Sequence, residues 1–127
     1  MPGKKVVIFD DEVDMLTVTE TILQSRGFEV VTFESSKNAI EDIKKEKPDL
    51  ILLDINMPHK DGYQVCDEVR CDDEIKHIPI IVFTAQTIEK DLIDKAHEFY
   101  GADDYVIKPF EANDLVEKIE KNILKNR

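Results

Sequence analysis

The stretch DLILLD, residues 49–54, places four consecutive apolar residues between two aspartates. A strand that is buried on both faces is apolar at every position, whereas a strand with one face in water alternates apolar and polar residues. Residues 50–53 therefore predict a strand of a parallel sheet that is covered on both sides. The Asp54 carboxylate would then stand where this strand ends.

Three further apolar runs, at residues 6–9, 80–83 and 105–107, and a valine-rich stretch at 28–33 have the length of strands. The segments between and after them carry residues at helical spacing, three or four positions apart, as a helix with one buried face requires. The inward positions are Met15, Leu16, Thr19, Ile22 and Leu23; Ala39, Ile40 and Ile43; Leu92, Ile93, Ala96 and Phe99 in a helix at about 88–100; and Leu115, Ile119 and Ile123.

Local signals predict the ends of the first two helices. Gly27 is expected to end the first helix, because glycine tolerates the left-handed backbone found there. Ser35 or Ser36 is expected to cap the second helix, which should stop before Pro48.

The alternation of strands and helices, repeated five times, indicates an α/β fold. We expect a doubly wound sheet of five parallel strands, with five helices covering its two faces. The crossovers between strands should be right-handed. In such sheets ligands bind beyond the carboxyl ends of the strands, where the strand order reverses. The residues at these strand ends are therefore the first candidates for a functional site.

The size and charge of the chain restrict what it can do. Its 127 residues fit one domain, spanning 1–127, and no apolar run approaches the roughly 20 residues of a membrane span. The formal net charge of -11 disfavours direct binding to nucleic acid or an anionic membrane, since both attract basic surfaces. Without a secretory signal at the start, the expected compartment is the cytoplasm. Cys66 and Cys71 match no redox or zinc pattern and are interpreted as reduced thiols on different faces of a helix.

Polar residues follow four of the predicted strands. The first strand ends in Asp10, Asp11 and Glu12, the third in Asp54, the fourth in Thr84, and the fifth in Lys108. Each of these residues alone has an ordinary explanation, such as a helix cap or a solvated lysine. Together they are expected to meet at one edge of the sheet.

The chemistry of these side chains favours phosphoryl transfer. Asp10, Asp11 and Asp54 would crowd three carboxylates, which calls for a cation, and Mg²⁺ suits oxygen ligands of this kind. An aspartate can accept a phosphoryl group covalently and needs no general base, because it is already ionised at neutral pH. Lys108 would supply a positive charge and Thr84 a hydroxyl donor to the phosphoryl oxygens.

At this point the sequence resembles the receiver domains of response regulators in two-component signalling, among them the single-domain chemotaxis type. The resemblance covers essentially the whole chain. It rests on VVIFDDE at 6–12, DLILLDINMPHKDG at 49–62, PIIVFTA at 79–85 and GADDYVIKPF at 101–110. It implies a flavodoxin-like three-layer sandwich with strand order 2-1-3-4-5.

The resemblance also implies a role for each site residue. Asp54 matches the phosphoacceptor, which makes it the modified residue. Asp10 and Asp11 match the acidic pair that holds Mg²⁺, with Asp11 as the direct ligand, and Asn56 matches the position whose backbone carbonyl joins Asp54 in binding the metal.

Further roles follow from the last two motifs. Thr84 and Lys108 match the residues that contact the phosphoryl oxygens. Tyr105 matches the aromatic switch that, together with Thr84, reorients after phosphorylation. A cis peptide bond is implied between Lys108 and Pro109, as X-Pro bonds permit.

The function implied is a phosphorylation-dependent signalling switch of a phosphorelay, which promotes its own phosphotransfer and dephosphorylation and is not otherwise an enzyme. The expected partners are a sensor histidine kinase or phosphotransfer protein, and a downstream protein that binds the surface of the fourth helix, the fifth strand and the fifth helix. No motif specifies the kinase or the output. Both a stand-alone receiver and a part of a larger regulator are compatible with the sequence.

Three other classes of protein share parts of the pattern. A haloacid-dehalogenase-like phosphatase would use Asp10 as its nucleophile, but Glu12 replaces the second aspartate of that motif. A flavodoxin-like electron carrier would need a loop rich in Ser, Thr and Gly after the first strand, where this chain has acids. A purely structural interaction module leaves the acidic strand ends unexplained.

Overall fold

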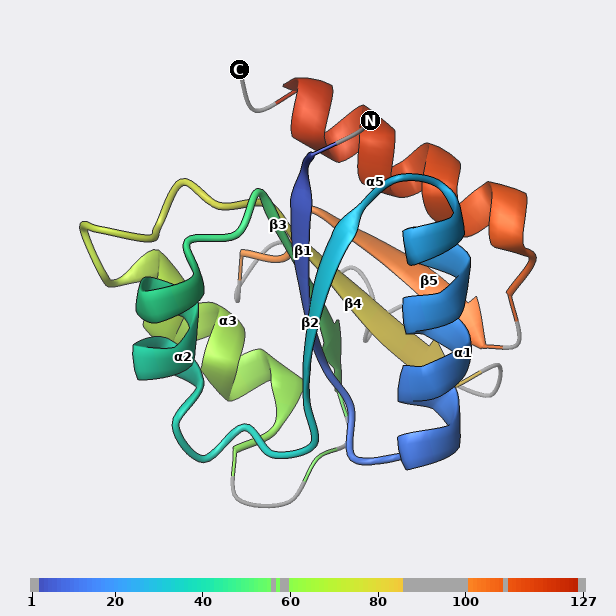
Figure 1. The fold of residues 1–127 in the computed structure, drawn as a ribbon. Helices are drawn as coiled ribbons and strands as arrows, with labels where there is room; N and C mark the ends of the chain where they lie inside the picture. The colour runs from blue at the N-terminus through green and yellow to red at the C-terminus, as the bar shows by residue number, and fades with distance from the viewer. Residues whose placement is uncertain (1–2, 56, 58–59, 86–100, 109, 126–127) are drawn as a thin grey trace.

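The computed structural model describes residues 3–55, 57, 60–85, 101–108 and 110–125, and shows them as an α/β fold (Figure 1). The helix expected at about 88–100 lies outside these residues. The described elements are β1 (Lys5–Phe9), α1 (Val13–Ser25), β2 (Glu29–Phe33), α2 (Ala39–Glu46), β3 (Leu50–Asp54), α3 (Gly62–Arg70), β4 (Ile80–Ala85), β5 (Asp104–Lys108) and α5 (Ala112–Lys125). None of the described helices is both long and apolar enough to cross a membrane.

The five strands form one parallel sheet in the order β2-β1-β3-β4-β5, which confirms the expected fold class and strand order. Strand β3 lies at the centre, and all five of its residues are buried, as the continuous apolar run predicted. The order reverses between β1 and β3, because the chain first builds outward to β2 and then returns to the other side of β1. The carboxyl ends of β1 and β3 therefore lie side by side.

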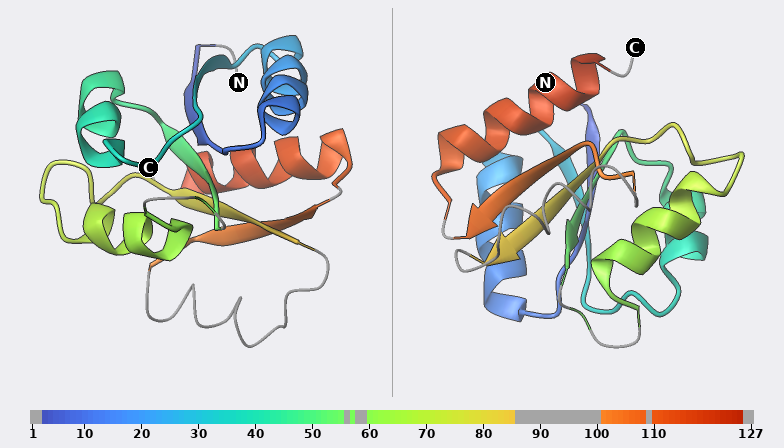
Figure 2. Two further views of the ribbon diagram at one scale, coloured as in Figure 1. Left: turned by 90° about the horizontal axis from the view of Figure 1, so that it is seen from below. Right: turned by 180° about the vertical axis from the view of Figure 1, so that it is seen from behind.

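The two faces of the sheet belong to two separate cores (Figures 1 and 2). Because side chains alternate along a strand, neighbouring residues in β1 and β3 point into different cores. Val7, Phe9, Ile51 and Leu53 pack with α2 and α3, whereas Val6, Ile8, Leu50 and Leu52 pack with α1 and α5. Among the described residues, helices thus cover both faces, which gives the three layers expected.

The helix ends confirm one local prediction and contradict another. Gly27 follows the end of α1 with a φ of +89°, as expected. The predicted cap at Ser35 or Ser36 is wrong, because α2 begins later and its N-cap is Asn38. Buried Ser36 instead donates its hydroxyl to the backbone oxygen of Lys60 and so joins the loop after β2 to the loop before α3.

The two cysteines differ in burial, and only Cys66 lies within a helix. Cys66 is buried inside α3, and Cys71 is exposed at its C-cap. Burial raises the pKa of the Cys66 thiol to about 12, so this thiol stays protonated at neutral pH. Protonated thiols are poor nucleophiles, which agrees with the ordinary reduced thiol expected from the sequence.

Arg70, the last residue of α3, holds together the loops that lead into β4 and β5. Its guanidinium donates to the backbone oxygens of Lys76 (2.9 Å), Ile78 (2.7 Å) and Gly101 (2.9 Å), and to the Asp103 carboxylate (2.6 Å). The same carboxylate accepts the first backbone amide of β4 at 2.8 Å. Gly101 has a φ of +79°, and a Cβ there would come within 2.6 Å of the Arg70 side chain. A single side chain thus aligns the starts of two strands.

Replacing Arg70 should therefore destabilise the fold. We expect Arg70→Ala to lower the free energy of unfolding by about 2–3 kcal/mol, because several hydrogen bonds to a charged donor are lost together. Lys76→Ala is the matched control, since its ion pair with Asp73 is exposed and such pairs contribute at most about 1 kcal/mol. Urea unfolding followed by circular dichroism measures both. Equal losses in the two variants would contradict the role of Arg70.

Candidate functional site

Three strands deliver charged side chains to one edge of the sheet. Asp10 directly follows β1, Asp54 is the last residue of β3, and Lys108 is the last residue of β5. Thr84 is placed by its backbone near the end of β4, where it pairs with Ile107. The predicted convergence of Asp10, Asp54 and Lys108 is therefore confirmed, and the role expected of the Thr84 side chain stays a prediction.

The centre of the site is an ion pair between Lys108 and two buried carboxylates. The Lys108 Nζ lies 3.0 Å from an Asp10 oxygen and 3.3 Å from an Asp54 oxygen. Asp10 has no exposed surface, and Asp54 is 6% exposed. Burying a charged group is costly unless it is paired, and the lysine places an opposite charge in contact with both buried carboxylates.

The surroundings of Lys108 act on its charge in opposite directions. Burial disfavours the ammonium, but the hydrogen bond to Asp10 and the negative charges of Asp54 and Asp10 outweigh it, so the pKa of Lys108 lies above its usual value. The ammonium also lies 5.3 Å from the centre of the Phe83 ring in β4. Lys108 is therefore a permanent cation at neutral pH, held over an aromatic surface.

Hydrogen bonds hold both the backbone amide and the side chain of Asp10. Its backbone amide donates a hydrogen bond to the backbone oxygen of Phe33 at the end of β2 (3.1 Å). One carboxylate oxygen accepts a hydrogen bond from the backbone amide of Glu12 (2.9 Å). The other oxygen accepts from Lys108. Both oxygens of Asp10 are thus engaged, and its side chain has no access to solvent. Asp54 is the more accessible of the two buried acids.

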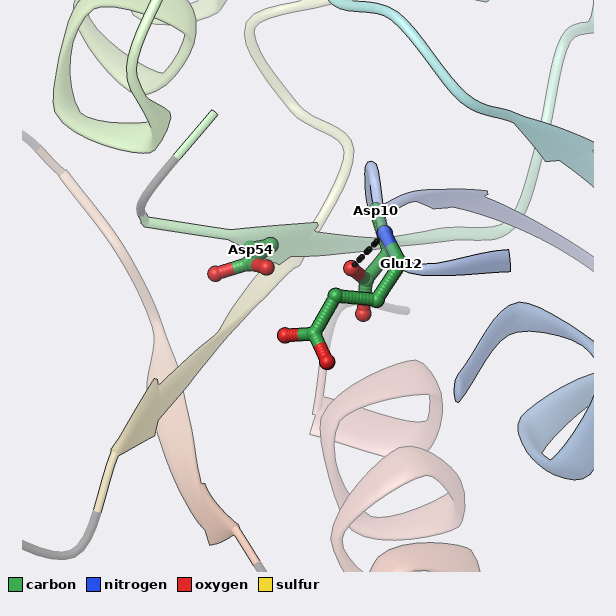
Figure 3. A group of neighbouring side chains, drawn as sticks. All are labelled: Asp10, Glu12 and Asp54. Atoms are coloured by element: carbon green, nitrogen blue, oxygen red, sulfur yellow. Dashed lines mark hydrogen bonds between the residues drawn. The ribbon is translucent and has the colours of Figure 1, made fainter. Parts of the chain in front are cut away.

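A third acid, Glu12, joins this group. Asp10, Glu12 and Asp54 each present a carboxylate oxygen, and the three atoms lie within 4.8 Å of one another (Figure 3). The Glu12 oxygen lies 3.8 Å from the Lys108 Nζ, although the side chain is 67% exposed. Glu12 was expected at this strand end, but no role was predicted for it. Its position directly after Asp11 was the only signal.

Asp11 and Asn56 were also expected to bind the metal. Asp11 is exposed and is not one of the three acids that lie together. Asn56 lies outside the described residues, as does Pro109 with the expected cis peptide bond. The assignments of Asp11 and Asn56 to a metal stay predictions.

Gly62, the first residue of α3, packs directly against the strand end that carries Asp54. A Cβ at Gly62 would lie 2.7 Å from the Asp54 backbone oxygen and 2.8 Å from the Ile55 Cα, closer than any side chain can approach. The Gly62 amide donates to the Ile55 oxygen at 2.9 Å. Gly62 belongs to the motif at residues 49–62, but its positioning role could not be predicted from that motif, because close approach between backbones appears only in three dimensions.

Tyr105, the expected switch residue, lies on β5 and is half-buried. The Lys118 ammonium from α5 stands 4.6 Å from the centre of its ring and donates a hydrogen bond to its backbone oxygen. Lys118 also lies 3.7 Å from an Asp104 carboxylate oxygen. The ring of Tyr105 is thus held between its strand and α5, and its reorientation stays a prediction.

Comparison with solved structures finds the same fold in signalling proteins. A putative response regulator from Chloroflexus aurantiacus is 33% identical and superposes with a TM-score of 0.89, covering 98% of this chain and 99% of the other. The chemotaxis protein CheY4 of Vibrio cholerae is 27% identical, with a TM-score of 0.85 and coverage of 94% and 98%. The receiver domain of a sensor histidine kinase from Pseudomonas aeruginosa, solved with a magnesium ion in its active site cleft, is 28% identical, with a TM-score of 0.85 and coverage of 95% and 98%.

A family model leads to the same result. The model of the response regulator receiver domain matches residues 6–120, which include every strand and helix of the described chain in whole or in part. The match spans Asp10, Asp54 and Lys108, so the ion pair described above lies inside the family's region. The chain therefore belongs to the response regulator receiver domains of two-component signalling.

Proposed function

We propose that this receiver is a switch in which Asp54 accepts a phosphoryl group from the phosphohistidine of a sensor histidine kinase or a phosphotransfer protein. The observation that carries the proposal is the Lys108 ammonium, 3.3 Å from the Asp54 carboxylate and 3.0 Å from that of Asp10. A cation at this place neutralises negative charge that gathers on Asp54. Residues 1–127 act as one such domain in the proposal.

The transfer itself requires little of the protein beyond positioning and charge. An Asp54 oxygen attacks phosphorus while the phosphorus–nitrogen bond of the phosphohistidine breaks, and the imidazole leaves with the bonding electron pair. Lys108 and the Thr84 hydroxyl are assigned to the phosphoryl oxygens, on which the charge accumulates. Asp54 is preferred over Asp10 as the nucleophile, because both Asp10 oxygens are already bonded and the residue is fully buried.

The acids present fit a magnesium ion. Three carboxylate oxygens within 4.8 Å of one another form the hard, anionic oxygen set that magnesium prefers. Asp10, Asp11, Asp54 and the backbone carbonyl of Asn56 would hold the ion, and Glu12 adds negative charge beside it. When bound, the ion supplies positive charge that lets an anionic phosphoryl donor approach the carboxylates. The magnesium ion in the related Pseudomonas aeruginosa receiver domain supports this assignment.

The output is proposed to pass through β5 and α5, together with the helix expected at 88–100. Thr84 and Lys108 lie near the ends of adjacent strands, so a phosphoryl group on Asp54 would interact with both side chains. Tyr105, three residues before Lys108, would then take a new position. A downstream protein that binds this surface would sense the change. The acidic chain, with a net charge of -11, is proposed to act in the cytoplasm through proteins and without direct contact with nucleic acid or membrane.

Phosphorylation should depend on Asp54. Incubation with acetyl phosphate, a small activated donor, and magnesium is expected to yield an acid-stable, base-labile adduct of one phosphoryl group on the wild type. Asp54→Asn should yield none, because an amide is not a nucleophile of this kind. Intact-protein mass spectrometry detects the adduct. Asp10→Asn serves as the comparison, and an adduct that disappears only in that variant would favour the phosphatase reading.

Metal binding should depend on Asp11. Calorimetric titration with magnesium is expected to give one site on the wild type, and Asp11→Asn should weaken it by about tenfold or more, that is about 1.4 kcal/mol. Glu12→Gln should have a smaller effect, because that side chain is mostly exposed. The control is Asp14→Asn, an exposed acid in the first turn of α1 and outside the cluster. Equal affinities of wild type and Asp11→Asn would remove Asp11 from the site.

Lys108 should couple phosphorylation to the output surface. Beryllofluoride can stand in for the phosphoryl group on Asp54, and in the wild type it is expected to shift the amide resonances of residues 104–118. Lys108→Ala should abolish these shifts, because the cation that senses the new charge is gone. Thr84→Ala should reduce them through the loss of one hydroxyl contact. Lys121→Ala, an exposed lysine on α5, is the control. Full shifts in Lys108→Ala would contradict the coupling.

A further inference from the structure

A groove runs between β5 and α5, next to the strand that ends in Lys108. Its volume is about 400 Å³, within the range of sites that bind small molecules or single side chains. Its lining on the strand side includes Tyr105, Ile107 and Phe110. Ile107 is 39% exposed, one of the few large apolar side chains of the described residues that reach the surface. Figure 2 shows β5 and α5 lying next to each other.

The opposite wall of the groove is acidic. Glu111, directly before α5, and Asp114 and Glu117 on one side of α5 line it at intervals of three residues, and all three are exposed. Among the described residues, no ion pair or side-chain hydrogen bond neutralises these carboxylates. Lys118, the one basic residue of the lining, is already engaged by Tyr105 and Asp104. Within the part of the chain that the structure describes, the groove therefore presents unpaired carboxylates beside an apolar surface.

The groove is in contact with the phosphorylation site through aromatic rings. The Lys108 ammonium lies 5.3 Å from the centre of the Phe83 ring, and Phe83 stacks on Phe110 at 5.6 Å. Phe110 in turn lines the groove. A second cavity, lined by Lys44, Pro48 and Ile78 among others, lies at the opposite ends of the strands and has no such connection. Only the first of these two cavities adjoins the residues that would respond to phosphorylation.

We propose that this groove binds the downstream protein, through a segment in which lysine or arginine side chains flank an apolar anchor. The inference rests on the proposed switch function and adds the chemistry of the partner. The apolar anchor would cover Ile107 and Phe110, while the cations would meet Glu111, Asp114 and Glu117. Complementary charge favours encounter with such a segment and disfavours acidic partners, because like charges placed together cost several kcal/mol. Nucleic acid and anionic lipid are excluded as occupants by the same charge.

The test uses a helical peptide of leucine and lysine as the probe, with a leucine and glutamate peptide of the same length as its counterpart. The isotope-labelled full chain is titrated with and without beryllofluoride, and amide shifts are followed. The lysine peptide should shift residues 104–118. A variant with Glu111→Gln, Asp114→Asn and Glu117→Gln should bind it at least about tenfold more weakly.

A matched variant separates the groove from the overall charge. Glu41→Gln, Asp67→Asn and Glu74→Gln change the net charge by the same amount, at exposed positions outside the groove in α2, α3 and the turn after α3. This variant should bind the lysine peptide within about twofold of the wild type. Equal weakening in both variants, or equal binding of the glutamate peptide, would overturn the proposal.

A second measurement distinguishes a failure of the groove proposal from a failure of the proposed switch function. Acetyl phosphate labelling of Asp54 is measured on the same groove variant, which leaves Asp10, Asp54 and Lys108 in place and should label like the wild type. If the wild type takes up no phosphoryl group, the switch function fails, and the peptide titration of the unphosphorylated chain still decides whether the groove selects cations. If labelling is normal and the lysine peptide shifts no groove residue, the groove proposal alone fails.

Discussion

The contact of the Lys108 ammonium with the buried carboxylates of Asp10 and Asp54 is the interaction on which the site depends. Two carboxylates taken out of water side by side would force one of them to bind a proton, unless a cation lies between them. Lys108 supplies that cation, and removal of any partner from such a buried group leaves an uncompensated charge that is costly to the fold. A change of charge at Asp54 therefore acts directly on this contact.

The strand order explains why a lysine is needed for this contact. Strand β5 is not a neighbour of β1 or β3, because β4 lies between β5 and β3. Strands in a sheet are spaced about 4.8 Å apart, so only a long side chain at the end of β5 can reach across the end of β4. The Lys108 ammonium, which contacts the two acids, also lies near the Phe83 ring of β4. Phe83 in turn stacks on Phe110, which lines the surface between β5 and α5.

The sequence predicted correctly those strands and helices in which buried residues recur at a regular spacing. The unbroken apolar run at residues 50–53 predicted a fully buried central strand, and all of β3 is buried. The spacing of Leu115, Ile119 and Ile123 predicted the inner face of the last helix, and these residues are buried in α5. The cap at Ser35 or Ser36 was wrong, since a serine can bond to its local backbone or to a distant loop with similar energy. Ser36 bonds to Lys60, 24 residues away, a choice that local sequence does not encode.

The strands, the helical faces and the residues at the strand ends could be inferred from the amino-acid order alone, because they follow from short-range periodicity and from the fact that parallel strands end at one edge of a sheet. Three features appear only once the chain is folded: Lys108 bridges Asp10 and Asp54, Glu12 lies in the acidic group while Asp11 is exposed, and Gly62 packs on the backbone of Asp54. These contacts join residues up to 98 positions apart. Their distances depend on how the layers pack and on the direction of each side chain, and neither is a property of any local stretch of sequence.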